Sequence, residues 1–369
     1  MILETLSLAS GYGNFAVPEV ALAAATAALA AGHSAPLDVS PIAGLPELRE
    51  ALAARYRQRG ATGLTAEQVV VTSGAKTALF ALLCELLQPG DDVLLPTPNW
   101  FGFFEMVSRA GGELRTLPLP AADTYALRPE TLRAALTPAT RLLILSNPNN
   151  PTGRVYARAE WAALLAVTAD FPDLWVLSDE IYEGITFGPE PVPTLLAWPD
   201  PRQRHVVVSG FSKSLALAGW GVGCLVAPAA LAAAVAARLF ATGAAVPVPA
   251  QAAALAATEH AEAIGAALCA QLAPTRQLLL DGLAALPGAA GTVVAPEGTY
   301  YVFADFTRFL SPDLPAAEAS AQLVQRLADA GVAVVDGATC GAPGFVRISY
   351  AVDEAVLRPA LVCLGSSLK

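Results

Sequence analysis

Short apolar runs alternate with stretches of helical periodicity over much of this chain, and this alternation limits its fold more than any other feature. Residues 69–72 (Val-Val-Val-Thr) indicate a buried strand, and residues 75–88 have leucines at helical spacing before Pro89-Gly90. Further strands are expected at residues 92–95, 114–117, 142–146, 174–178 and 205–209, and helices at 100–110, 129–136 and 159–169. This order predicts an α/β fold whose large domain has a mostly parallel sheet, covered by helices on both faces.

The pattern changes after about residue 260. A long Ala/Leu helix is expected to reach residue 286, followed by strands at 300–304, 332–335 and 345–349 and helices at 316–330 and 354–364. These elements predict a smaller α+β C-terminal domain. The helix expected at residues 18–31 could pack on either unit. We therefore expect a large domain at residues 32–260 and a small domain formed by residues 1–31 plus 261–369.

Composition excludes several classes of partner. Charged residues make up 15% of the 369 residues and the formal net charge is −10, so no nucleic-acid partner is expected. The five cysteines form no Cys-x-x-Cys motif, which argues against a disulfide framework or a structural metal site. Residues 214–258 carry one charge, Arg238, but alanine dominates and glycine and proline interrupt them, so no membrane span is expected. The first ten residues lack a positive n-region, so we expect no signal peptide and a cytoplasmic location.

Polar residues follow several of the expected strands, where parallel sheets gather their working groups. Ser73-Gly74-Ala75-Lys76-Thr77 opens a helix, and small residues there expose backbone N–H groups to an anion. An ordinary capped glycine turn is the alternative. After the strand at 142–146, two Asn-Pro steps in residues 146–153 could hold an Asn amide rigidly, although a proline-rich loop reads the same way.

Two further strand ends carry an acidic pair and a lysine. Asp179-Glu180 directly follows an apolar strand, where a carboxylate is costly without a cationic partner, and Tyr182 lies two residues beyond. Lys213 follows the strand at 205–209, where its amine could be desolvated and nucleophilic. An anion cradle, a fixed Asn, a carboxylate with a nearby Tyr and a lysine together fit a phosphorylated pyridine aldehyde held as a Schiff base.

With these residues in view, the chain resembles the aspartate-aminotransferase-like superfamily of class I/II aminotransferases, which are fold type I pyridoxal-phosphate enzymes. The motifs that carry the resemblance are residues 42–49, 73–79, 150–153, 178–182, 212–213 and 345–350, in the expected order and over nearly the whole chain. The resemblance implies pyridoxal 5'-phosphate as cofactor, amino acids and 2-oxo acids as substrates, and a homodimer.

The resemblance also implies roles for individual residues. Lys213 would form the Schiff base and act as general acid and base, and Asp179 would pair with the pyridine nitrogen. The remaining roles are contacts to the ring oxygen from Asn150 and Tyr182, stacking on the ring by Trp100, phosphate binding by Gly74, Ala75, Lys76 and Ser212, and close backbone approach to the substrate at Gly11.

Arg347 can be argued from the strand pattern as well. Alternation in residues 345–349 places Phe345, Arg347 and Ser349 on one face. An arginine among apolar neighbours calls for an anionic partner, which it grips through two hydrogen bonds. The resemblance implies that this partner is the substrate α-carboxylate, and a structural ion pair is the alternative.

The chain departs from the family pattern at the cofactor phosphate. Gly221 stands eight residues after Lys213, where the family has a phosphate-binding arginine, and Gly210 stands where Ser or Thr is frequent. Val39 lies near the position of a tyrosine that reaches across the dimer. In one alternative, the cradle at residues 73–77 and Ser212 suffice to hold the phosphate. In the others, Lys76 or Arg238 replaces the missing arginine, or the cofactor is retained less tightly.

An aminotransferase is thus the expected function. The alternatives are a pyridoxal-phosphate lyase of the carbon–sulfur β-lyase type, or other Cα chemistry on the same fold, and a cofactor-binding regulator without turnover. The presence of both Lys213 and Asp179 argues against the regulator. Phe15, Trp100, Phe101, Tyr300 and Tyr301 could line an apolar substrate pocket or belong to the core, and no second arginine marks a dicarboxylate substrate.

Overall fold

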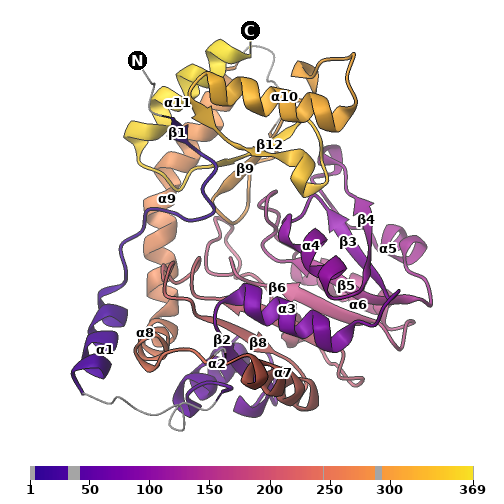
Figure 1. Cartoon of the computed structure of the whole chain (residues 1–369), viewed down its shortest axis with the longest axis vertical. Coiled ribbons are helices and arrows are strands. Elements are labelled where there is room, and N and C mark those ends of the chain that lie inside the picture. The colour runs from indigo at the N-terminus through magenta and orange to yellow at the C-terminus, as the bar shows by residue number, and fades with distance from the viewer. Residues whose placement is uncertain (1–4, 32–41, 244, 287–292, 369) are drawn as a thin grey trace.

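A seven-stranded sheet forms the centre of the larger part of the molecule (Figure 1). The computed structural model describes residues 5–31, 42–243, 245–286 and 293–368. The strands lie in the order β2-β8-β7-β6-β5-β3-β4, and every pairing is parallel except the two made by β8. Their bounds are β2 Val69–Thr72, β3 Asp92–Thr97, β4 Glu113–Pro118, β5 Thr140–Ser146, β6 Trp175–Asp179, β7 His205–Gly210 and β8 Gly223–Val226. The expected mostly parallel α/β sheet is confirmed.

Helices cover both faces of this sheet because alternate strand residues feed two cores. Val70, Leu95 and Ile144 pack with α3 (Ala75–Leu86), α4 (Gly102–Arg109) and α7 (Ala229–Thr242). Their neighbours Val71, Leu94 and Leu145 pack with helices on the other face. These helices are α2 Pro46–Gln58, α5 Pro129–Ala135, α6 Arg158–Thr168 and α8 Val248–Glu259.

The C-terminal part forms a smaller α+β unit above the sheet (Figure 1). Its antiparallel sheet has the order β11-β12-β9, with β9 Tyr301–Asp305, β11 Val335–Asp336 and β12 Phe345–Ser349. Its helices are α9 Ala261–Ala284, α10 Ala316–Asp329 and α11 Glu354–Ser367. Leucines from α9, α10 and α11 and the inward residues of the strands form one core.

The N-terminal segment touches both units. β1 (Leu6–Ser7) pairs with β10 (Val332–Ala333) of the smaller unit, whereas α1 (Glu19–Ala30) packs against α8 of the larger one. Gly11 lies between these two attachments and therefore passes over the carboxyl ends of the large sheet. The division into residues 32–260 and 1–31 plus 261–369 stays a prediction.

Two local expectations differ from the structure. β8 was not predicted, since its four residues lie in an Ala/Gly-rich stretch; it runs antiparallel because a loop, not a crossover helix, joins it to β7. The single strand expected at residues 332–335 is two short strands, β10 and β11, which belong to different sheets. Within the described residues, no helix combines the length and apolar character needed to span a bilayer.

Candidate active site

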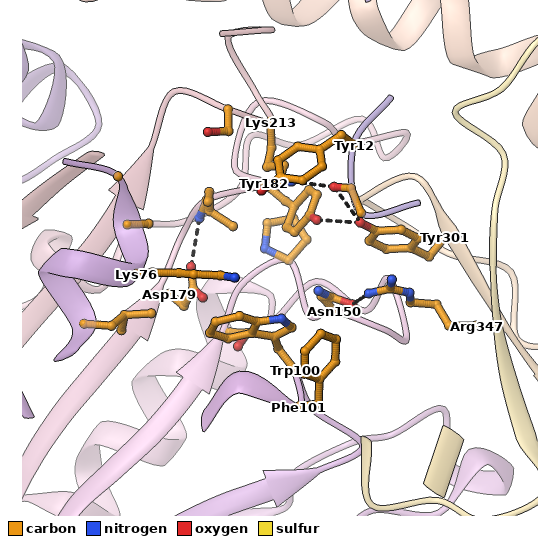
Figure 2. A pocket seen from close by; sticks show the side chains of 18 of the residues that line it. Tyr12, Lys76, Trp100, Phe101, Asn150, Asp179, Tyr182, Lys213, Tyr301 and Arg347 are labelled. Atoms are coloured by element: carbon orange, nitrogen blue, oxygen red, sulfur yellow. Dashed lines mark hydrogen bonds between the residues drawn. The ribbon is translucent and has the colours of Figure 1, made fainter. Parts of the chain in front are cut away.

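A cavity of about 720 Å³ lies between the carboxyl ends of the large sheet and the smaller unit (Figure 2). It brings together all of the predicted site residues: Gly11, Gly74, Ala75, Lys76, Trp100, Asn150, Asp179, Tyr182, Ser212, Lys213 and Arg347. They come from loops that follow β2, β3, β5, β6 and β7, from the N-terminal segment and from β12. Their proximity follows from parallel strands, whose carboxyl ends share one edge.

Lys213 stands just beyond β7 with its amine turned into the cavity. The amine donates a hydrogen bond to the carbonyl oxygen of Gly11 and lies 3.6 Å from the centre of the Tyr12 ring. Burial lowers the pKa of Lys213 to about 7, and the positive charges of Arg347 and Lys76 act in the same direction. A large share of this amine is therefore uncharged and nucleophilic near neutral pH.

Asp179 ends β6, and its side chain is 8% exposed. Burial raises the pKa of Asp179 to about 7, a hydrogen bond from the N–H of Ile181 (3.2 Å) opposes this rise, and the charge of Glu180 adds to it. Within the described part of the chain, Asp179 forms no ion pair closer than 4 Å. A buried carboxylate that faces a cavity in this way fits a cationic ligand atom.

Three tyrosines meet beside the carbonyl of Gly11. The Tyr182 and Tyr301 hydroxyls are 2.9 Å apart, and the Tyr300 and Tyr301 hydroxyls donate to the Gly11 carbonyl at 2.8 and 3.3 Å. Burial raises the pKa of all three phenols, so they are neutral donors at physiological pH. They tie the N-terminal segment to the cavity wall.

Arg347 occupies the opposite wall and is 4% exposed. Its guanidinium donates to Asn150 Oδ1 and to the Ala9 carbonyl, each at 3.2 Å, and lies 4.2 Å from the centre of the Tyr301 ring. Among the residues that the structure describes, no carboxylate pairs with it, so the structural ion pair is not found. The arginine can therefore accept an anion that enters the cavity.

The amino end of α3 forms the anion cradle at the floor of the cavity. Gly74 is its N-cap with φ +83°, and a glycine has no side chain that could cap the first-turn amides. A Cβ on Gly223 would lie 2.4 Å from the Ala75 nitrogen, so β8 packs directly behind this turn. Gly221, in contrast, has no atom within 4 Å of the position of its missing Cβ, so the space beside the cradle is open.

The structure separates the groups that could replace the family's phosphate arginine. The Lys76 amine lines the cavity, 5.6 Å from the centre of the Trp100 ring. Arg238 lies on α7, where it pairs with Glu85 and does not line the cavity. Gly210 is buried against Ala75, and Val39 lies outside the described residues.

Sequence reasoning missed Tyr12, whose ring covers the Lys213 amine although the side chain is 53% exposed. Its position next to Gly11 was the available signal. It also missed the partners of Glu180 and Glu183 on α2 and at its end, because nothing in the sequence pairs these glutamates with particular arginines.

The chain belongs to the family of class I and II aminotransferases, whose family model matches residues 4–364. It is thus an aminotransferase, an enzyme that moves an amino group between an amino acid and a 2-oxo acid, and the resemblance in its motifs is confirmed.

Several named relatives span almost the whole chain. It is 38% identical to the aspartate/prephenate aminotransferase of Thermus thermophilus, over 97% of this chain and 90% of that protein. It is 32% identical to an aspartate aminotransferase of Rhizobium meliloti, over 96% and 86%. The solved structure of Thermus thermophilus aspartate aminotransferase with maleate has a TM-score of 0.89 and 35% identity, over 99% of this chain and 92% of that one.

Proposed function

We propose that this aminotransferase works with pyridoxal 5'-phosphate attached through Lys213. When bound, the cofactor supplies an electron-withdrawing ring that weakens the bonds to the substrate α-carbon. One observation carries the proposal. Lys213 and Asp179 line the same cavity, and the amine and the carboxylate both have pKa values of about 7. The amine is available as a nucleophile, and the carboxylate is available to a cation.

The donor set fits the cofactor at both of its ends. Asp179 would hold the protonated ring nitrogen, because it is a buried carboxylate that faces the cavity without a cationic partner. Asn150 and Tyr182 would contact the ring oxygen, and Trp100 would cover the ring. The phosphate would take the first-turn amides of Gly74, Ala75 and Lys76 and the Ser212 hydroxyl.

Substrate orientation would come from the walls of the cavity. Arg347 would bind the α-carboxylate through its guanidinium, and Asn150, which already accepts from that guanidinium, would fix its angle. The backbone of Gly11 would limit the space beside the substrate amine. Once its nitrogen is free, the Lys213 amine is the base that would take the proton from the substrate α-carbon, and it would release that proton to a different carbon, since a proton returned to the α-carbon would undo the step.

Aspartate is the amino donor that we propose. Relatives named for aspartate cover nearly the whole chain, and Lys76 adds a positive charge to the cavity besides Arg347 and Lys213. A second carboxylate on the substrate would pair with the Lys76 amine. The same relatives suggest prephenate as a 2-oxo acid acceptor to test.

We also propose a cytoplasmic homodimer. Large apolar side chains are exposed on three helices that pack on the larger unit, namely Leu29 on α1, Phe80 on α3 and Phe240 on α7, and a second copy of the chain would cover them. Phe101 and Tyr12 are exposed at the cavity itself, which supports an interface that would lie next to the substrate.

The test is a visible titration of the purified protein reconstituted with pyridoxal 5'-phosphate. Single amino acids are added without any 2-oxo acid. We expect the absorbance band of the lysine-bound cofactor to disappear stably, and a 2-oxo acid added afterwards should restore it. Pyruvate and ammonia accumulating with a persistent band would instead indicate a lyase. Lys213→Ala is expected to abolish the band, and a borohydride-reducible bond in that variant would overturn the assignment of Lys213.

A further inference from the structure

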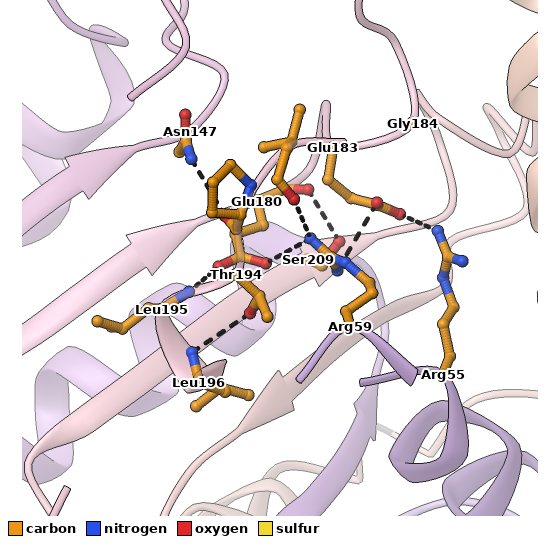
Figure 3. Close-up of polar contacts among 12 residues, drawn as sticks. Arg55, Arg59, Asn147, Glu180, Glu183, Gly184, Thr194, Leu195, Leu196 and Ser209 are labelled. Atoms are coloured by element: carbon orange, nitrogen blue, oxygen red, sulfur yellow. Dashed lines mark hydrogen bonds and ion pairs between the residues drawn. The ribbon is translucent and has the colours of Figure 1, made fainter. Parts of the chain in front are cut away.

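A mostly buried cluster of four charged side chains, Arg55, Arg59, Glu180 and Glu183, lies beside the end of β6 (Figure 3). Arg55 lies on α2 and Arg59 directly follows its last residue, whereas Glu180 and Glu183 lie three residues apart in the turn after β6. Asp179 and Glu180 are consecutive, so their side chains leave the strand end on opposite faces. The chemistry proposed above uses none of the four charges.

Glu180 is completely buried and held from several directions. One carboxylate oxygen accepts from the N–H of Leu195 at 2.9 Å, and the other accepts from Arg59 Nη2 at 3.3 Å. Its own N–H donates to the Val208 carbonyl at 2.8 Å. Glu180 is therefore held in place between the carboxyl ends of β6 and β7 and the end of α2.

Arg59 connects the two glutamates. Its Nη1 lies 3.6 Å from Glu183 Oε2, and its Nη2 also donates to the Val192 carbonyl at 3.3 Å. Glu183 has a second cation in Arg55, with which it forms a hydrogen-bonded ion pair. Burial raises the pKa of Glu180, and Arg59, the one cation among the described residues that pairs with it, opposes this rise most, ahead of the hydrogen bonds from the Leu195 N–H and the Thr194 hydroxyl.

Protein and not water separates the charge of Glu180 from Asp179, so salt weakens their electrostatic interaction only slightly. The other charged side chains that line the cavity around Asp179 in the described chain are the cations Lys76 and Arg347, together with Lys213, whose amine is only partly charged near neutral pH, and none of them is negative. Behind the strand, the nearby Tyr56 and Cys224 have pKa values raised by burial and are uncharged. Glu180 is therefore the closest fixed negative charge that adds to the field of Asp179.

We propose that Glu180 strengthens the hold of Asp179 on a cation in the cavity, and that Arg59 is the positioning residue that keeps Glu180 ionised and in place. The inference rests on the proposed function, because the cation would be the protonated ring of the cofactor. The rise that the charge of Glu180 causes in the pKa of Asp179 agrees with this coupling.

The test is a pH titration of the visible band in reconstituted holoenzyme. Glu180→Gln removes a negative charge behind Asp179, which makes the cationic form of the bound cofactor less stable. That form should therefore be lost at lower pH, with the midpoint of the titration shifted down by about 0.5–1 pH unit. The double variant Arg59→Gln/Glu180→Gln should show the same shift as Glu180→Gln, because Arg59 acts only through Glu180. Glu50→Gln is the matched control, because the pair that it breaks with Arg57 is exposed on α2.

An unmoved midpoint in Glu180→Gln would overturn the proposal, and so would recovery of the midpoint in the double variant, because the shift would then come from the unpaired charge of Arg59. If Glu180→Gln does not fold, Glu183→Gln takes its place, with a smaller shift in the same direction expected because Glu183 lies farther along the turn. Absence of a lysine-bound band in the unmodified protein would instead overturn the proposed function. The two failures are therefore distinguishable.

Discussion

At the scale of single residues, burial supports the proposed chemistry of Lys213 and Asp179. Removing both side chains from water disfavours the charged form of each, which lowers the pKa of Lys213 and raises the pKa of Asp179 until both reach about 7. Neither value would follow from the residue type, since an exposed lysine and an exposed aspartate have pKa values about six units apart.

Capture of the cofactor by the cofactor-free protein should depend on pH accordingly. The pKa of Lys213 is depressed, so the uncharged amine is scarce below pH 7 and predominates above it. The rate at which the visible band forms should rise about tenfold per pH unit below 7 and level off above. Stopped-flow absorbance between pH 5.5 and 9 measures this dependence. A rate that still rises steeply at pH 9 would contradict it.

Lys76 offers a second test at this scale. If its amine pairs with a substrate carboxylate, Lys76→Met should reduce kcat/KM for aspartate by about 10- to 100-fold, the effect of losing a hydrogen bond to a charged group. The reaction with an uncharged amino donor should change little. Steady-state kinetics with both donors measure the difference. Equal losses for both donors, together with weaker cofactor binding, would assign the amine to the phosphate instead.

At the scale of elements, the cavity depends on how closely β8 approaches the amino end of α3. Gly223 permits this approach, because any Cβ there would overlap the backbone of Gly74 and Ala75. The first-turn amides of α3 thereby stay fixed and face the cavity. The open space at Gly221 lies in the loop that leads into the same strand.

Gly223→Ala should therefore damage the anion cradle. The overlap with backbone at 2.4 Å forces the strand or the helix to shift, with an expected loss of about 1–3 kcal/mol in the free energy of unfolding. Cofactor affinity, measured by fluorescence titration, should fall as well. Gly188→Ala is the control, since its nearest neighbour is a side-chain oxygen at 3.9 Å, and it should change neither quantity.

Gly221→Arg tests whether the cradle lacks a cation. The position has φ +66°, so a side chain there costs about 1–2 kcal/mol of stability, but nothing blocks its Cβ. A guanidinium beside the phosphate should raise cofactor affinity by about tenfold or more. Gly221→Ala carries the same strain without the charge, and an equal affinity in both variants would show that the charge plays no part.

At the scale of the whole molecule, the site exists because three separate parts of the chain meet. The large sheet supplies Lys213, Asp179 and Tyr182, the smaller unit supplies Arg347, Tyr300 and Tyr301, and the N-terminal segment closes the space between them. The segment is anchored on both units, through β1 and through α1. A change in how the two units sit would therefore move Gly11 relative to Lys213.

Association of two copies is the prediction at this scale. Phe240 is 75% exposed on α7, and Phe240→Glu would place a charge on the surface that we expect to be covered. The variant should shift from dimer toward monomer in light scattering, with a loss of specific activity. Val362→Glu is the control: Val362 is 73% exposed on α11, in the smaller unit. If the molecular mass of Phe240→Glu in light scattering is unaltered, α7 is not part of the interface.

The sequence by itself determined the α/β class and the places where chemistry would occur. Strand and helix periodicity are local properties, so the strands ending at Ser146 and near Asp179 could be predicted to within two residues, and Lys213 could be placed at a strand end. Two places were the exception: β8 lies in an Ala/Gly-rich stretch, and the split between β10 and β11 leaves no mark on the hydrophobic pattern.

Tertiary structure alone decided the contacts that give those residues their properties. Lys213 meets Gly11 across 202 residues of sequence, Arg347 meets Asn150 across 197, and Arg59 meets Glu180 across 121. The pKa values of Lys213 and Asp179 depend on burial and on these neighbours. Local periodicity specifies which face of an element is apolar. It does not specify which distant part of the chain will pack on that face or which charged residues that part will contain.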